Sequence, residues 1–146
     1  MATTFIVPGL NGSEPEHWQS WFERHLPNCV RVVQGDWEKP DLPRWSAKLR
    51  SELNRTPGRV FIVAHSFGCL AAAQTAFDCR ELVAGVMLVA PADPDRFGLG
   101  RVVPARSLGV PAIRSRNVSR RLGPGMSLVI SVANVLAALV LAFSRP

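Results

Sequence analysis

Residues 60–68 of this chain read Val-Phe-Ile-Val-Ala-His-Ser-Phe-Gly, an apolar run followed by a serine between small residues. The run Val60–Ala64 has the length and continuous hydrophobicity that are typical of a buried strand in a parallel sheet. The alanine-rich residues 67–77 that come next predict a helix. The stretch therefore predicts a strand that turns sharply at Ser66 and continues directly into a helix.

Ser66 lies in the pattern small-x-Ser-x-Gly, in which Ala64 and Gly68 are the small residues and His65 precedes the serine. In a nucleophile elbow, small residues at these positions leave room for the closely approaching backbone. The turn raises the serine hydroxyl above the carboxyl ends of the strands, and the helix that begins at Phe67 directs its first N–H groups toward the same place. Ser66 is therefore the candidate nucleophile. The alternative is that Ser66 only caps the helix.

Strands and helices are predicted to alternate along the first ninety residues. Strands are expected at residues 3–7, 30–33, 60–64 and 83–89, and helices at residues 16–26, 42–54 and 67–77. This order predicts an α/β fold with a layered, mostly parallel sheet. The glycine-rich loop after the first strand contains Leu10 and Asn11, and the backbone N–H of either residue is a candidate second donor to an oxyanion.

The composition is that of one globular domain, with 146 residues of which 47% are hydrophobic and 19% are charged. This length excludes a complete (β/α)₈ barrel. Charge is distributed unevenly, because residues 1–95 carry 9 basic and 11 acidic side chains, whereas residues 96–146 carry 8 arginines and no acid. We therefore predict a domain at residues 1–113 and a divergent tail, rich in arginine and apolar residues, at 114–146.

Cys29, Cys69 and Cys79 are spaced neither as zinc ligands nor as a redox pair. We expect free thiols in a reducing cytoplasm, with no metal and no cofactor. Residues 1–5 contain no basic region and no long apolar stretch, so a secretory signal is not expected.

Several separated motifs occur in the order found in a known family: residues 5–13, 16–19, 36–37 with Pro40, 64–68 and 90–93. They resemble the retinoblastoma-binding-protein-9-type (YdeN-like) serine hydrolases over residues 3–113. The resemblance implies a compact α/β-hydrolase fold, which is a three-layer α/β/α sandwich. It also implies a Ser-Asp-His triad and hydrolysis of carboxylic esters or related small-molecule acyl substrates. It implies that Ser66 is the nucleophile, and that Phe67 and either Leu10 or Asn11 donate backbone N–H groups to the oxyanion.

The chain departs from this family where the rest of the triad is expected. In the hydrolase fold the acid and then the histidine follow the serine, but no histidine follows Ser66 in this sequence. The motif at residues 115–117 is followed by Val118 instead of an acid, and the last strand and helix of the family have no counterpart. His17 is the candidate substitute base, with an ordinary structural role as its alternative. The sequence thus leaves two functions open: a serine hydrolase, and a catalytically inactive hydrolase-fold interaction protein.

The tail has three alternatives. The charge-free residues 126–143 follow a cluster of arginines and have the minimum length of a membrane-spanning helix. In the second alternative, the same segment packs on the open edge or face of the sheet. In the third, it is a non-native, unstructured tail, such as a frame shift produces. Nucleic-acid binding by residues 96–121 is not expected, because they contain no aromatic residue other than Phe97 and match no binding motif. The sequence defines neither the substrate nor the oligomeric state.

Overall fold

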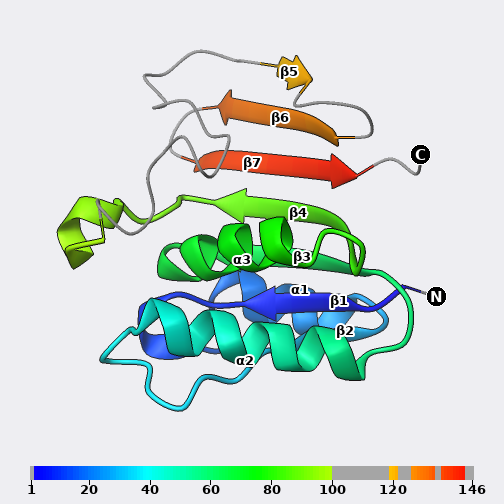
Figure 1. Cartoon of the computed structure of the whole chain (residues 1–146). Helices are drawn as coiled ribbons and strands as arrows, with labels where there is room; N and C mark the ends of the chain where they lie inside the picture. Colours follow the sequence, from blue (N-terminus) through cyan, green and yellow to red (C-terminus); the bar gives the residue numbers. More distant parts are fainter. Residues whose placement is uncertain (1, 100–118, 122–125, 134–135, 144–146) are drawn as a thin grey trace.

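Strands and helices alternate in the structure, a computed structural model that describes residues 2–99, 119–121, 126–133 and 136–143 (Figure 1). Up to residue 97 the elements are β1 (Thr4–Val7), the 3₁₀ turn η1 (Leu10–Gly12), α1 (Trp18–His25), β2 (Cys29–Arg31), α2 (Leu42–Arg55), β3 (Val60–His65), α3 (Phe67–Asp78), β4 (Val83–Val89) and η2 (Pro94–Phe97). The strands and helices that the sequence predicts are all present, within a few residues of their predicted bounds.

The strands β1 to β4 form a parallel sheet in the order β2-β1-β3-β4. In Figure 1, α2 and α3 cover one face of this sheet and α1 lies on the other. This arrangement confirms the predicted three-layer α/β fold. Because the four strands run in the same direction, their carboxyl ends meet at one edge, where the segments that follow β1 and β3 lie close together.

The main core lies between the sheet and the helices α2 and α3. Trp45, Leu49 and Leu53 of α2 are at most 2% exposed, and these are the residues that share one face at helical spacing. Alanines dominate the buried side of α3, and Ala72 and Ala76 pack into the same core cluster as the sheet residues. Small side chains at these positions allow α3 to lie close to the sheet.

The apolar side of α1 is not the side that the fold buries. Helical spacing places Trp21 on one face of α1 with Trp18, Phe22 and His25. In the structure, however, Trp21 is 49% exposed. The buried residues of α1 are instead Gln19 and Ser20. Periodicity identified the helix but not its inward side, because these polar side chains find hydrogen-bond partners that compensate for their burial.

The charge-free residues 126–143 do not form the helix that a membrane span requires. They form β6 (Met126–Ala133) and β7 (Leu136–Phe143), which pair antiparallel with each other, while β7 also pairs antiparallel with β4. Together with β5 (Ser119–Arg121), these strands extend the sheet to the order β2-β1-β3-β4-β7-β6-β5. The helical interpretation was wrong because the open edge of β4 offers unpaired backbone groups that an apolar strand satisfies.

The pairing of β7 with β4 corresponds to the second alternative for the tail, and the third alternative, an unstructured tail, does not describe β6 and β7. Within the described residues, the structure contains no helix with the length and apolarity needed to cross a membrane. The strand expected at Val110–Ile113, the motif at 115–117 and the boundary after residue 113 lie outside the described residues, so these predictions stay untested.

Candidate active site

Ser66 occupies the sharp turn between β3 and α3 that the sequence predicted. Its φ of 52° and ψ of −124° lie in a region that non-glycine residues rarely adopt. Backbone hydrogen bonds hold this conformation: the Ser66 N–H donates to the Val89 carbonyl at 3.2 Å, and the Ser66 carbonyl accepts from the N–H groups of Cys69 and Ala92 at 3.0 and 3.1 Å. A strained backbone of this kind persists only where the surrounding structure determines it.

The hydroxyl of Ser66 is not used to cap α3, because its side chain forms no capping hydrogen bond with that helix. The interpretation of Ser66 as only a helix cap was therefore wrong. The residue is half-buried, and within the described residues Oγ makes no hydrogen bond. The oxygen is thus held at the carboxyl edge of the sheet without a partner.

Two glycines bring the loop after β1 against this turn. A Cβ placed on Gly68 would lie 2.3 Å from the Pro8 carbonyl oxygen and 2.5 Å from the Val7 carbonyl oxygen. A Cβ placed on Gly9 would lie 2.7 Å from Ser66 Cβ. Any side chain at either position would separate the two segments, so the glycines set the distance between the loop and the serine.

The close approach of the loop places backbone N–H groups beside the turn. The Asn11 N–H donates to the Trp37 carbonyl at 3.2 Å, so it is not available to a ligand in this structure. The Leu10 N–H has no acceptor among the described residues. Phe67 is the first residue of α3, and its N–H has no acceptor within the helix. Leu10 and Phe67 are therefore the candidate donors that remain.

The side chain of Gln19 connects the segments that build this site. It is fully buried, and its Nε2 donates to the carbonyl of Val7 at 3.3 Å and to the carbonyl of Val63 at 3.1 Å. Its Oε1 accepts from the Ser13 hydroxyl at 2.8 Å. One amide thus connects the ends of β1 and β3 with the loop that carries Leu10. The sequence contained this glutamine in the motif at residues 16–19, but its role depends on contacts that the motif does not reveal.

Among the described residues, no histidine forms a hydrogen bond with Ser66. His17 caps α1, since its Nδ1 accepts from the Gln19 N–H at 3.3 Å, and its ring centroid lies 4.8 Å from that of His65. His65 also contacts Trp18 edge-on, with ring centroids 6.0 Å apart. His17 therefore contacts His65, the residue before Ser66, and does not contact the serine by a hydrogen bond within the described residues. It has the structural role that the sequence offered as the alternative to a substitute base.

Two of the four carboxylates that follow Ser66 are engaged elsewhere. Asp78 forms an ion pair with Arg50 at 2.7 Å, and Asp93 caps η2 by accepting from the Asp95 N–H at 3.0 Å. Within the described residues, no carboxylate forms an ion pair with a histidine. The described part of the chain therefore contains a candidate nucleophile and candidate oxyanion donors without an assembled acid and base.

The imidazoles of His17 and His65 both favour their neutral forms. Burial lowers the pKa of His17, and Arg31 lowers it further while Glu14 opposes the shift. Burial also lowers the pKa of His65, and the neighbouring His17 adds to this effect. A pair of neutral rings suits their close contact, because two charged rings at this distance would repel each other.

We expect the stability of the protein to decrease as the pH falls below 6.5, the ordinary pKa of both histidines. In the unfolded chain they bind protons at about this pH, whereas in the folded chain they do so only at lower pH, so the unfolded state binds more protons in this window. The midpoint of thermal unfolding, measured from pH 8 to pH 5, should fall less steeply in His65→Gln than in the unmodified chain. An equal slope in both would contradict this explanation.

The three cysteines are free thiols, as expected, and two of them are buried. Cys69 lies in the core, where burial raises the pKa of its thiol. It donates a hydrogen bond to the Val89 carbonyl at 3.4 Å. This thiol is therefore not a candidate nucleophile. Within the described ranges, no group of three or more His, Cys, Asp or Glu side chains is arranged to bind a metal ion.

The parallel sheet with its flanking helices is an α/β fold of the hydrolase type. The profile of a family described as serine hydrolase matches residues 4–134, and the chain belongs to this family. A crystal structure named as a YdeN-like hydrolase from Pectobacterium atrosepticum is 44% identical and superimposes with a TM-score of 0.67. The match covers 72% of this chain and 57% of that protein, so the chain spans little more than half the length of this relative. No curated protein matches the chain significantly.

Proposed function

We propose that this chain attacks carboxylic esters or related acyl bonds of small molecules through an acyl-enzyme on Ser66. The observation that supports this proposal best is the Ser66 hydroxyl, which lies at a strained turn without a hydrogen-bond partner among the described residues, next to the Phe67 N–H at the start of α3. Among serine hydrolases we assign the chain to the retinoblastoma-binding-protein-9-type branch, because its motifs resemble that branch over residues 3–113.

In the proposed reaction, Ser66 Oγ attacks the acyl carbonyl carbon and loses its proton to a base. The carbonyl oxygen becomes an oxyanion, which accepts hydrogen bonds from the N–H groups of Leu10 and Phe67. The intermediate collapses by expelling the alcohol, which takes up a proton, and leaves an ester on Ser66. Water then attacks this ester, releases the carboxylic acid and returns the proton to Ser66.

Within the described residues no base forms a hydrogen bond with Ser66, and this limits the rate of the first step. A serine hydroxyl is a weak nucleophile at neutral pH, and loss of a triad member reduces kcat by about four orders of magnitude or more. The oxyanion donors alone retain a residual rate enhancement. We therefore propose slow acyl transfer, with His17 as the substitute base because it is the histidine of the motif beside the oxyanion loop.

A second candidate function is that of a hydrolase-fold interaction protein without catalysis. The observation that favours it is the absence of any histidine after Ser66 in the sequence. We propose a cytoplasmic location and no nucleic-acid partner for either function, because the free cysteines suit a reducing compartment and the arginine-rich segment matches no binding motif.

We expect a fluorophosphonate probe to label the full chain at Ser66, and Ser66→Ala to abolish the labelling. The probe requires an accessible, activated serine, so labelling separates a working nucleophile from an inactive module. Turnover of p-nitrophenyl acetate should be weak in the same preparation. Mass spectrometry of the labelled chain identifies the modified residue.

Absence of labelling in the folded chain would refute the hydrolase proposal and support the interaction protein. Rapid ester turnover that Ser66→Ala abolishes and His17→Ala leaves intact would show that a base other than His17 operates. Rapid turnover that both variants abolish would identify His17 as that base.

A further inference from the structure

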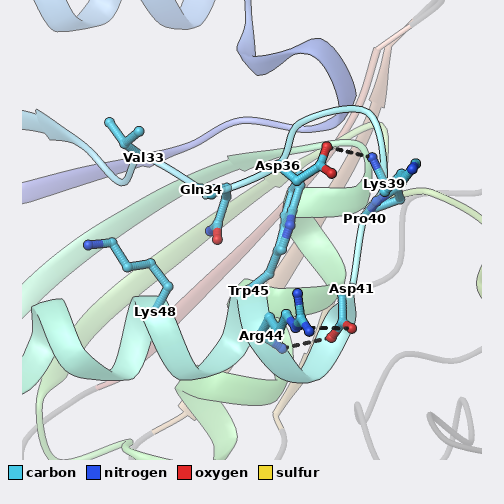
Figure 2. A pocket seen from close by; sticks show the side chains of 10 residues that line it. Val33, Gln34, Asp36, Lys39, Pro40, Asp41, Arg44, Trp45 and Lys48 are labelled. Atoms are coloured by element: carbon cyan, nitrogen blue, oxygen red, sulfur yellow. Dashed lines mark hydrogen bonds and ion pairs between the residues drawn. The ribbon is translucent and has the colours of Figure 1, made fainter.

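The loop after β2 and the first turns of α2 enclose a pocket of about 970 Å³ (Figure 2). Its lining comes from residues 33–36 and 39–41 of the loop and from Arg44, Trp45 and Lys48 of the helix. Neither Ser66 nor the loop that carries Leu10 lines it. The pocket is therefore a feature that the proposed acyl transfer does not use.

Gln34 lies in the wall of this pocket with its amide unsatisfied. The side chain is only 5% exposed, and its Nε2 has no hydrogen-bond partner among the described residues. Figure 2 shows the amide directed from the loop toward α2, on the side of the pocket that Lys48 borders. A buried amide donor without a partner destabilises a fold, so such a group in a native protein requires an explanation.

A comparison with Gln19 shows how unusual Gln34 is. Both glutamines are buried, but Gln19 uses its amide nitrogen for two carbonyl oxygens and its amide oxygen for a hydroxyl. Gln19 therefore contributes to the fold, whereas the Gln34 nitrogen contributes nothing to it within the described residues. We infer that the Gln34 amide serves a ligand instead of the fold.

The acidic side chains of the pocket already have partners, so they are not the acceptors that Gln34 lacks. Asp36 accepts from the backbone N–H groups of Glu38 and Lys39 at 2.9 and 3.0 Å. Asp41 caps α2 by accepting from the Arg44 N–H at 2.9 Å. Since no acceptor for the Gln34 donor lies within the described residues, we look for one on a ligand.

The pocket provides positive charge for such an acceptor. Arg44 and Lys48 stand one turn apart on α2, where residues four apart share a face. Arg44 lies 3.7 Å from Asp41 and Lys48 lies 2.7 Å from Glu52, but a guanidinium has five N–H donors and an ammonium has three. Both cations thus retain donors for a ligand anion.

We propose that this pocket binds a small organic carboxylate, one oxygen of which accepts from Gln34 Nε2 while Arg44 and Lys48 neutralise its charge. A monoanion fits better than a phosphate dianion, because Asp36 and Asp41 line the same pocket and would repel a second negative charge. The exposed Val33 and the half-buried Pro40 provide apolar surface for the body of the ligand.

Titration of the full chain with sodium benzoate by isothermal calorimetry tests this proposal. We expect saturable binding in the millimolar range, weakened about tenfold in Gln34→Leu, which is the loss expected for one hydrogen bond to a charged group. We expect the midpoint of unfolding of Gln34→Leu to be equal to or higher than that of the unmodified chain, because the variant removes an unsatisfied donor. Gln19→Leu is the matched control for stability, and its midpoint should fall.

Four results would overturn the proposal. The first is that the unmodified chain binds no benzoate. The second is that Gln34→Leu binds benzoate as tightly as the unmodified chain does. A lower unfolding midpoint in Gln34→Leu would show that the amide has a structural partner. Binding of neutral benzamide or of inorganic phosphate as tightly as benzoate would exclude the carboxylate as the preferred ligand.

Discussion

Gly68→Ala is expected to destabilise the folded protein by about 3 kcal/mol or more, the upper part of the range for overpacking. The added Cβ would lie 2.3 and 2.5 Å from the carbonyl oxygens of Pro8 and Val7. These atoms belong to the backbone at the end of β1, so they cannot move aside as a flexible side chain does. Either α3 must shift away from the sheet or β1 must break its pairing with β3.

Urea denaturation followed by far-UV circular dichroism measures this effect. Gly35→Ala is the matched control, because no heavy atom of the described residues lies within 4 Å of the Cβ position at Gly35. It should change the free energy of unfolding by no more than about 0.5 kcal/mol. If Gly68→Ala were as stable as Gly35→Ala, the close approach of α3 to the end of β1 would be wrong.

The same variant should also reduce labelling of Ser66. Gly68 lies two residues after the nucleophile, and its contact with Pro8 determines how closely the loop carrying Leu10 approaches the turn. A shift of this loop would separate the Leu10 N–H from the Phe67 N–H. Labelling that persists at the full rate in a folded Gly68→Ala chain would show that this loop is not needed.

Gln19→Leu is expected to lower the free energy of unfolding by about 3 kcal/mol, since each buried polar group left unsatisfied costs about 1–3 kcal/mol. The variant removes the donor for the carbonyls of Val7 and Val63 and the acceptor for the Ser13 hydroxyl. Leucine has nearly the same volume, so the loss comes from hydrogen bonding and not from a cavity.

Chemical denaturation compares this variant with Gln74→Leu. Gln74 is half-buried, and its Oε1 accepts only a long hydrogen bond, 3.4 Å, from the Ser46 hydroxyl. Its replacement should cost about 1 kcal/mol or less. Equal losses in the two variants would contradict the connecting role of Gln19.

Gln19→Leu should also slow the labelling of Ser66 below the denaturation midpoint, where the chain is still folded. Val7 precedes the loop with Leu10, and Val63 precedes the elbow, so Gln19 holds the two segments at a constant separation. A merely structural role would leave the labelling rate of the folded fraction unchanged. The rate per folded molecule therefore separates positioning of the site from overall stability.

Much of the site followed from residues that are neighbours in the chain. The run Val60–Ala64 and the alanines after Gly68 predicted β3, the turn at Ser66 and α3, because continuous hydrophobicity and helix propensity are local properties. The stripe of Trp45, Leu49 and Leu53 predicted the buried face of α2 correctly for the same reason. The two glycines beside the serine could be identified in the sequence, but the atoms that exclude a side chain there could not.

The inward face of α1, by contrast, did not follow from its sequence. Its apolar residues indicated one face, but the fold buries Gln19, since the carbonyls at the ends of β1 and β3 compensate its amide. The choice between Leu10 and Asn11 also required the structure, because the Trp37 carbonyl that engages the Asn11 N–H is far away in sequence. Hydropathy described residues 126–143 as apolar, but not as strands, because strand pairing depends on a partner edge elsewhere in the chain.

The sequence by itself determined the alternation of strands and helices, the serine at the turn and the lack of a histidine after it, since composition, periodicity and order are properties of the chain. Only the tertiary structure decided which polar groups are satisfied: Gln19 fully, Asn11 by Trp37, and the Gln34 nitrogen not at all among the described residues. The reason is that a hydrogen bond between distant residues depends on distance and direction in space, and neither is encoded in local sequence.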